Sequence, residues 1–210
     1  MRGRLRVTLL LAALVLLCPA TAVRAQELGE GWIMPSDPDP GGLIPSRPDS
    51  PAAQAAPPVA SPGISADQIR RLIVTRLRLA DPRWRPWVLR QASCLAYAVY
   101  FEAQGETRLG QLAVAQVVLN RLHNPAYPKT VCRVIADRGQ FPWTTGDLTI
   151  RDMGRFRIAW SVALHMMAGI FTDPTGGATH FYAPARVAAP AWATPEAYLT
   201  TIGGHRFFRP

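Results

Sequence analysis

Residues 94–121 read CLAYAVYFEAQGETRLGQLAVAQVVLNR, and this stretch decides the fold. Two apolar runs lie on either side of Gly105, and each is long enough to form a helix. Thr107 stands where it would cap the second helix, which is apolar on nearly every side. The pattern therefore predicts two successive helices, the second of them buried at the centre of the domain.

Two glutamates, Glu102 and Glu106, follow the first apolar run. On a helix, Leu95, Val99 and Glu102 are spaced by four and three residues, so Glu102 continues an apolar stripe and Glu106 lies on the same face one turn later. A carboxyl group on such a stripe is partly desolvated, which favours its protonated form. This setting predicts a general acid at Glu102. Glu106 is better interpreted as a solvent-exposed or helix-capping residue.

Other polar and aromatic residues are suited to a carbohydrate cleft. Aromatic faces stack on sugar rings, and side-chain amides hydrogen-bond to N-acetyl groups. The candidate substrate-binding residues are Gln111, Gln140, Trp143 and Tyr182. For Trp143 and Tyr182, a place in the hydrophobic core is an equally good interpretation.

Helices are also expected before the central stretch. Ser65 and Gln68 have the spacing of a capping box, and apolar residues follow them at helical intervals. Pro82 and Pro86 are expected to end that helix. The first central helix is expected to begin near Gln91.

The C-terminal half combines helices with short extended segments. Residues 129–137 predict a short helix, residues 137–147 a strand or extended loop, and a further helix is expected from Arg155. The glycine pairs at 176–177 and 203–204 suit hairpin turns. These elements predict an α+β fold that is mainly helical, with a small β-sheet or hairpin.

Composition divides the chain into four parts. Residues 1–25 begin with three arginines within the first six residues, followed by an apolar run and small residues before the end, the pattern of a secretory signal peptide. Residues 26–63 contain nine prolines and predict a disordered linker. Residues 64–90 are expected to form an N-terminal helical extension, and residues 91–210 the main folded domain.

The net charge of +9 indicates an anionic partner such as nucleic acid, anionic lipid or an acidic wall polymer. Export excludes nucleic acid from these partners. The apolar run of the signal peptide is too short for a comfortable membrane span, so no stable span is expected after cleavage. A retained anchor is the alternative interpretation.

Cleavage of the signal peptide removes Cys18 and leaves Cys94 and Cys132. An even pair of cysteines in an exported protein predicts a disulfide, with two separate buried thiols as the alternative. With two cysteines and scattered histidines, no metal site and no cofactor are expected.

The stretch 94–121 is similar to the signature of the SleB/CwlJ-type cell wall hydrolases. In that signature, an aliphatic helix ending in Glu-Ala-x-Gly-Glu precedes a Gly-Gln-x-Ala-Val-Ala helix that ends in Asn-Arg. The resemblance continues through YPKTVCRVIADRGQFPW, GGATHFYAP and IGGHRFF, and covers about residues 91–208. Residues 91–210 therefore look like a cell wall hydrolase catalytic domain.

The resemblance implies a lysozyme-like fold and cleavage of the MurNAc-β-1,4-GlcNAc bond in peptidoglycan glycan strands. By position, Glu102 matches the catalytic acid of the family and Glu106 the second glutamate. Both would project from one face of one helix, so they are poorly placed to flank a sugar from opposite sides. We therefore expect a lytic transglycosylase in which Glu102 acts as acid and then as base, and Glu106 positions it or a water. One departure is Gln104, where the family commonly has an arginine.

The sequence is also compatible with two other functions. A wall-binding or scaffold protein on the same fold would need no catalytic acid. A metal-dependent amidase would use His165, His180 and His205, whose sequence settings match no ligand spacing. An enzyme that cuts the wall of its own cell needs restraint, so we also expect a regulatory partner in the envelope, and we place the protein in the periplasm or cell envelope.

Overall fold

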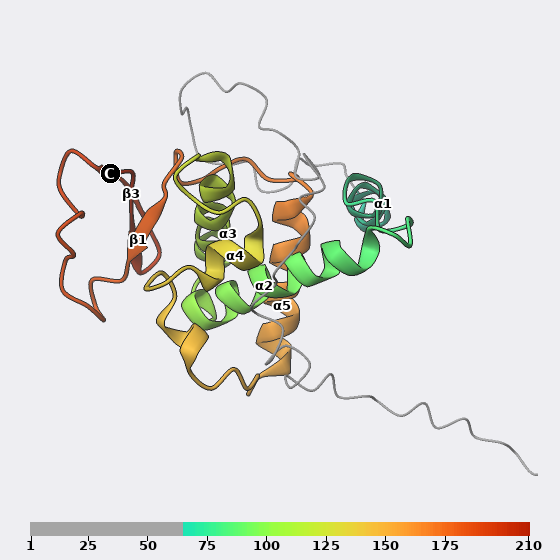
Figure 1. Ribbon diagram of the computed structural model, residues 1–210, viewed down its shortest axis with the longest axis horizontal. Helices are drawn as coiled ribbons and strands as arrows, with labels where there is room; N and C mark the ends of the chain where they lie inside the picture. The colour runs from blue at the N-terminus through green and yellow to red at the C-terminus, as the bar shows by residue number, and fades with distance from the viewer. Residues whose placement is uncertain (1–64) are drawn as a thin grey trace, which may run out of the picture.

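The computed structural model describes residues 65–210, so the predicted signal peptide and the whole predicted linker lie outside the described residues. The described chain forms five α-helices and a three-stranded antiparallel sheet. The sheet lies on one side of the helices and α1 on the other (Figure 1). The α+β, mainly helical class predicted from the sequence is confirmed.

The elements follow one another in a simple order. The helices are α1 (Ala66–Arg76), α2 (Arg85–Ala103), α3 (Arg108–His123), α4 (Val131–Ala136), the 3-10 helix η2 (Pro142–Thr145) and α5 (Met153–Met167). The strands are β1 (His180–Tyr182), β2 (Tyr198–Ile202) and β3 (His205–Phe208). No helix within residues 65–210 has both the length and the apolar character needed to cross a bilayer.

Helices α2 and α3 form the centre of the domain, as the sequence predicts. Helix α2 packs against α3, α4 and α5, and the side chains of Leu95 and Val99 are fully buried. Helix α3 also packs against the sheet, where Ala113 and Val117 share a hydrophobic cluster with Phe207. The two sides of α3 therefore connect the helical core to the strands.

The N-terminal boundaries differ in part from the prediction. The Ser65 and Gln68 capping box of α1 is present. Helix α2, however, begins at Arg85 and not near Gln91. Pro86 lies in the first turn of α2, where a backbone N–H has no partner within the helix, so proline is tolerated there.

Cys94 of α2 and Cys132 of α4 form the predicted disulfide, with their Cα atoms 5.3 Å apart. The bond joins two positions that are 38 residues apart in the sequence. It ties α4 to α2, and the segment that follows α4 contacts the end of α2 through Trp143 and Glu102.

The C-terminal half differs from the prediction in two places. The segment 137–147 contains the 3-10 helix η2 and no strand. The strand order is β1-β3-β2, and Gly203 and Gly204 form the β2–β3 hairpin turn as expected. Gly176 and Gly177 form no hairpin, because no strand precedes β1 in the described chain; they lie in a turn where Gly177 N–H donates to Asp173.

Candidate active site

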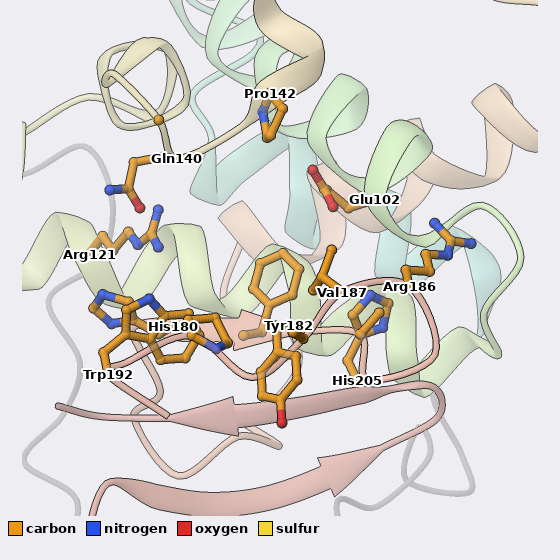
Figure 2. Close-up of a pocket in the computed structure, with 15 residues that line it drawn as sticks. Glu102, Arg121, Gln140, Pro142, His180, Tyr182, Arg186, Val187, Trp192 and His205 are labelled. Atoms are coloured by element: carbon orange, nitrogen blue, oxygen red, sulfur yellow. The ribbon is translucent and has the colours of Figure 1, made fainter. Parts of the chain in front are cut away.

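A cavity of about 530 Å³ opens where the end of α2 faces the sheet. Its walls come from α2, α3, the start of η2 and the segment before it, β1, the irregular segment 183–192 and β3 (Figure 2). The lining residues are Glu102, Arg121, Gly139, Gln140, Pro142, His180, Phe181, Tyr182, Ala183, Arg186, Val187, Ala188, Pro190, Trp192 and His205. Of these described residues, Glu102 alone carries a carboxyl group.

Glu102 lies in the last turn of α2 and points into the cavity (Figure 2). The indole Nε1 of Trp143 donates a hydrogen bond of 2.8 Å to Glu102 Oε1. Burial raises the pKa of the Glu102 carboxyl group, while the Trp143 hydrogen bond and the charge of Arg186 partly oppose that rise. A carboxyl group in this setting holds a proton at higher pH than an exposed one and can donate it.

Glu106 does not line the cavity. The sequence predicts both glutamates on one helical face. Helix α2 ends at Ala103, however, so that face does not extend to Glu106. Its carboxylate accepts hydrogen bonds of 3.2 and 3.1 Å from the backbone N–H of Gly204 and lies 3.5 Å from His205 Nδ1. Glu106 is therefore neither a solvent-exposed residue nor the cap of α3, but a contact between the α2–α3 turn and the β2–β3 hairpin.

The four predicted substrate-binding residues lie in different places. Gln140 and Tyr182 line the cavity. Trp143 is packed behind Glu102, with its ring stacked 4.9 Å from that of Phe101. Gln111 is buried and its Nε2 donates to the backbone oxygen of Glu106 over 3.3 Å, so it is not a cavity residue.

Arg186 and His205 line the cavity, and the sequence did not predict them there. Arg186 belongs to an irregular segment with no periodic pattern, so no local signal identifies it. His205 directly follows the Gly203–Gly204 turn, which was a usable signal for a side chain held at a fixed point. Burial lowers the pKa of His205, Glu106 opposes that effect and Arg186 adds to it.

The three histidines considered for a metal site do not lie together. His180 and His205 line the cavity, whereas His165 is on α5 and its Nδ1 contacts the Ser161 backbone oxygen. Within residues 65–210, no group of three or more His, Cys, Asp or Glu side chains is placed to hold a metal ion.

The folded part of this chain is similar in sequence to known proteins. Residues 105–208 match the family model described as Cell Wall Hydrolase. Spore cortex-lytic enzymes from Halalkalibacterium halodurans and Oceanobacillus iheyensis are 36% identical over 120 residues and 34% identical over 114 residues. Each alignment covers 54% of this chain, and 33% and 39% of the relative. The chain thus spans between about a third and two fifths of the length of these curated relatives.

Among solved structures, the chain is similar to the catalytic domain of the germination-specific lytic transglycosylase SleB from Bacillus anthracis, at 32% sequence identity. The alignment covers 57% of this chain and 93% of that structure, with a TM-score of 0.49. The family model spans every element from α3 to β3 and begins within the glutamate motif at Gly105. The folded C-terminal part of this chain therefore belongs to the cell wall hydrolase family of the SleB/CwlJ type.

Proposed function

We propose that this protein is an exported peptidoglycan glycosidase that cleaves the MurNAc-β-1,4-GlcNAc bond as a lytic transglycosylase. The observation that carries the proposal is the Glu102 carboxyl group, which faces the cavity and has a pKa raised by burial. The names of the curated relatives, spore cortex-lytic enzymes, support lysis of a wall polymer. The cavity, about 530 Å³ in volume, has room for sugar rings beside that carboxyl group.

The chemistry needs one group that first donates and then accepts a proton. Glu102 donates its proton to the glycosidic oxygen, the C1–O bond breaks, and the GlcNAc side leaves with a free 4-hydroxyl group. The Glu102 carboxylate then takes the proton of the muramyl C6 hydroxyl as that oxygen bonds to C1. The product is a 1,6-anhydro ring, no water is consumed, and Glu102 is protonated again for the next turnover.

The number of carboxyl groups at the cavity favours transglycosylation over hydrolysis. Glycosidases that use water or a covalent intermediate ordinarily place two carboxyl groups about 5–9.5 Å apart, on either side of the bond. Among the described lining residues, the cavity offers one, because Glu106 is bound to the β2–β3 hairpin. The C6 hydroxyl of the substrate replaces the second group.

We propose the periplasm or cell envelope as the place of action. The signal-peptide pattern of residues 1–25 and the Cys94–Cys132 disulfide both suit an oxidising compartment. The net charge of +9 attracts the protein to the carboxylates of wall peptides. Peptidoglycan strands are the proposed partner, together with an envelope regulator that restrains the activity.

The test is the product spectrum of purified sacculi. We expect the wild-type protein to release muropeptides with anhydro ends, which mass spectrometry separates from reducing ends by the mass of one water. Glu102→Gln keeps the shape of the side chain, but its amide is not acidic enough to protonate a glycosidic oxygen, so the variant should fold normally and release nothing. Glu196→Gln, an exposed residue away from the cavity, is the matched control and should retain activity.

The alternative function, a wall-binding or scaffold protein, gives a different result. Such a protein would bind sacculi equally well with Glu102 intact or replaced, and neither form would release products. Reducing ends would instead indicate a hydrolase. Product release by Glu102→Gln at the wild-type rate would refute the assignment of the acid.

A further inference from the structure

We propose that the end of the cavity formed by Arg121 and Gln140 is a carboxylate-binding subsite that selects among wall strands. The proposal rests on the wall-strand substrate of the proposed function, because both concern the same cavity. Figure 2 shows these two side chains close to each other, at the opposite end of the cavity from Arg186 and apart from Glu102. The subsite is therefore separate from the acid that cleaves the bond.

Arg121 is held in a fixed position near the end of α3. Its side chain is 3% exposed, and its Nε donates a hydrogen bond of 2.8 Å to the backbone oxygen of Thr179. The guanidinium carbon lies 5.2 Å from the ring centroid of Tyr127 and 5.7 Å from that of Phe141. These contacts restrict the guanidinium group before any ligand arrives, so little conformational entropy is lost on binding.

The charge of Arg121 is not neutralised by a neighbouring carboxylate. None of the ion pairs within residues 65–210 includes it, and Asp137 acts on it only as a more distant charge. Its buried Nη1 has no hydrogen-bond partner among the described residues. A buried, unpaired cation is unfavourable, and a guanidinium group stays protonated even when burial lowers its pKa. The site therefore complements an anion.

The neighbouring side chains favour a single anionic group. Gln140 lines the same end of the cavity and can donate through its amide. His180 also lines it, and its ring centroid lies 4.8 Å from that of Trp192. Burial and the charge of Arg121 both lower the pKa of His180, which favours the neutral imidazole over a second cation. One cation among neutral donors matches the planar, bidentate geometry of a carboxylate.

Carboxylates on a wall strand come from two sources. Stem peptides carry several, and the lactyl group of muramic acid carries one that is free only where the stem has been removed. Glucosamine residues carry none. Either source presents a carboxylate to Arg121. Binding to strands of defined composition distinguishes the stem carboxylate from the lactyl carboxylate.

The experiment measures binding without turnover, using the full chain with Glu102→Gln. Three soluble strands are compared: strands with stem peptides, strands whose stems have been removed, and stripped strands whose lactyl carboxylates have been converted to amides. Arg121→Met keeps the length of the side chain and removes its charge. We expect about a ten- to hundredfold loss of affinity for strands with the recognised carboxylate, the range for a hydrogen bond between charged groups. Affinity for the amidated strands should not change.

A control variant and the comparison of the three strands decide between the outcomes. Arg206→Gln removes an exposed charge outside the cavity, and its effect should be at most about twofold. A loss confined to stem-bearing strands assigns the stem carboxylate, and a loss on stripped strands assigns the lactyl carboxylate. An equal loss on all three strands, or none on any, overturns the proposal.

If Arg121→Met does not fold, the proposal can still be tested by comparing the affinities of the protein with Arg121 intact for the different strands. It must itself bind the carboxylate strands about ten- to hundredfold more tightly than the amidated ones, and equal affinities overturn the proposal. Failure of the proposed reaction is separable from failure of the subsite. If the Glu102→Gln protein distinguishes the strands while the wild-type protein releases no muropeptides, the reaction is refuted and the subsite is supported.

Discussion

Trp143 donates its indole N–H to Oε1 of Glu102 over 2.8 Å, and this bond joins the 3-10 helix η2 to the end of α2. The ring of Trp143 also stacks on that of Phe101, so the donor is fixed from behind. The carboxyl group is thereby subject to opposing effects: burial raises its pKa, and the Trp143 bond lowers it by stabilising the carboxylate. The second oxygen of the group is left to face a substrate.

Replacing Trp143 with phenylalanine should change both the pH profile and the rate. Trp143→Phe retains the stacking on Phe101 but removes the N–H donor. Because that donor lowers the pKa of Glu102, its loss should raise the pKa, and the alkaline limb of the kcat profile should move to higher pH. Loss of orientation should reduce kcat about tenfold. Turnover of defined strands across pH measures both, and an unchanged alkaline limb would contradict the role of the bond.

Replacing Arg186 should also move the alkaline limb of the kcat profile to higher pH. Its charge lowers the pKa of Glu102, so Arg186→Gln should raise that pKa and extend activity to higher pH. Added salt should mimic the substitution in the wild-type protein, since it screens the charge. The matched control is Arg206→Gln, an exposed arginine outside the cavity, which should leave the profile in place. A downward shift for Arg186→Gln would refute this reasoning.

The Glu106–hairpin contact predicts a strong requirement for glycine at position 203. Gly203 has a φ of 58°, and a Cβ atom there would collide with the Glu106 carboxylate. Gly203→Ala should therefore lower the free energy of unfolding by about 1–3 kcal/mol, with a fall in Tm of at least about 4 °C. Gly105→Ala, where a Cβ meets no atom within 4 Å, is the matched control.

A double-mutant cycle separates the collision from the backbone strain. Glu106→Ala removes the carboxylate that a Cβ at position 203 would meet. Combined with Gly203→Ala, it should therefore give a smaller loss than the two single losses added together. Strict additivity in thermal unfolding would show that only the left-handed backbone of Gly203 matters.

The disulfide should account for a large share of the stability of the domain. A bond between positions 38 residues apart contributes roughly 3–4 kcal/mol in the chain-entropy model. Reduction, or the pair Cys94→Ala and Cys132→Ala, should lower Tm by about 10 °C or more. Thiol labelling of the denatured, non-reduced protein should find no free thiol after removal of the signal peptide. An equal Tm with and without reductant would contradict the prediction.

The parts of the fold that depend on local pattern could be predicted. The apolar periodicity of α2 and α3 and the capping residues Ser65 and Thr107 are properties of neighbouring residues, and the structure has them as expected. The predicted start of α2 was wrong because proline is compatible both with the end of a helix and with its first turn. The segment with η2 was predicted as extended because its turn-forming and aromatic residues have no periodicity.

In the candidate site, too, the residues with a local sequence signal could be predicted and the others could not. Glu102 could be identified because it continues an apolar stripe on its own helix. Gln111 was placed in the cleft by residue type, although its side chain is buried against the Glu106 backbone. Arg186 and His205 reach the cavity from segments that lie far from Glu102 in the sequence. The glycine turn before His205 indicates a side chain held at a fixed point, but it does not indicate that this point faces Glu102.

The sequence by itself determined the class of the fold and the carboxyl group at position 102, because periodicity and an apolar stripe act over a few neighbouring residues. It determined the disulfide because only two cysteines follow the predicted signal peptide. Only the tertiary structure decided what surrounds that carboxyl group: Trp143 as its donor, Arg186 as its nearby charge, and Glu106 withdrawn to the hairpin. Desolvation and Coulomb interactions depend on distances in space, and those distances exist only once α2, η2 and the sheet have packed together.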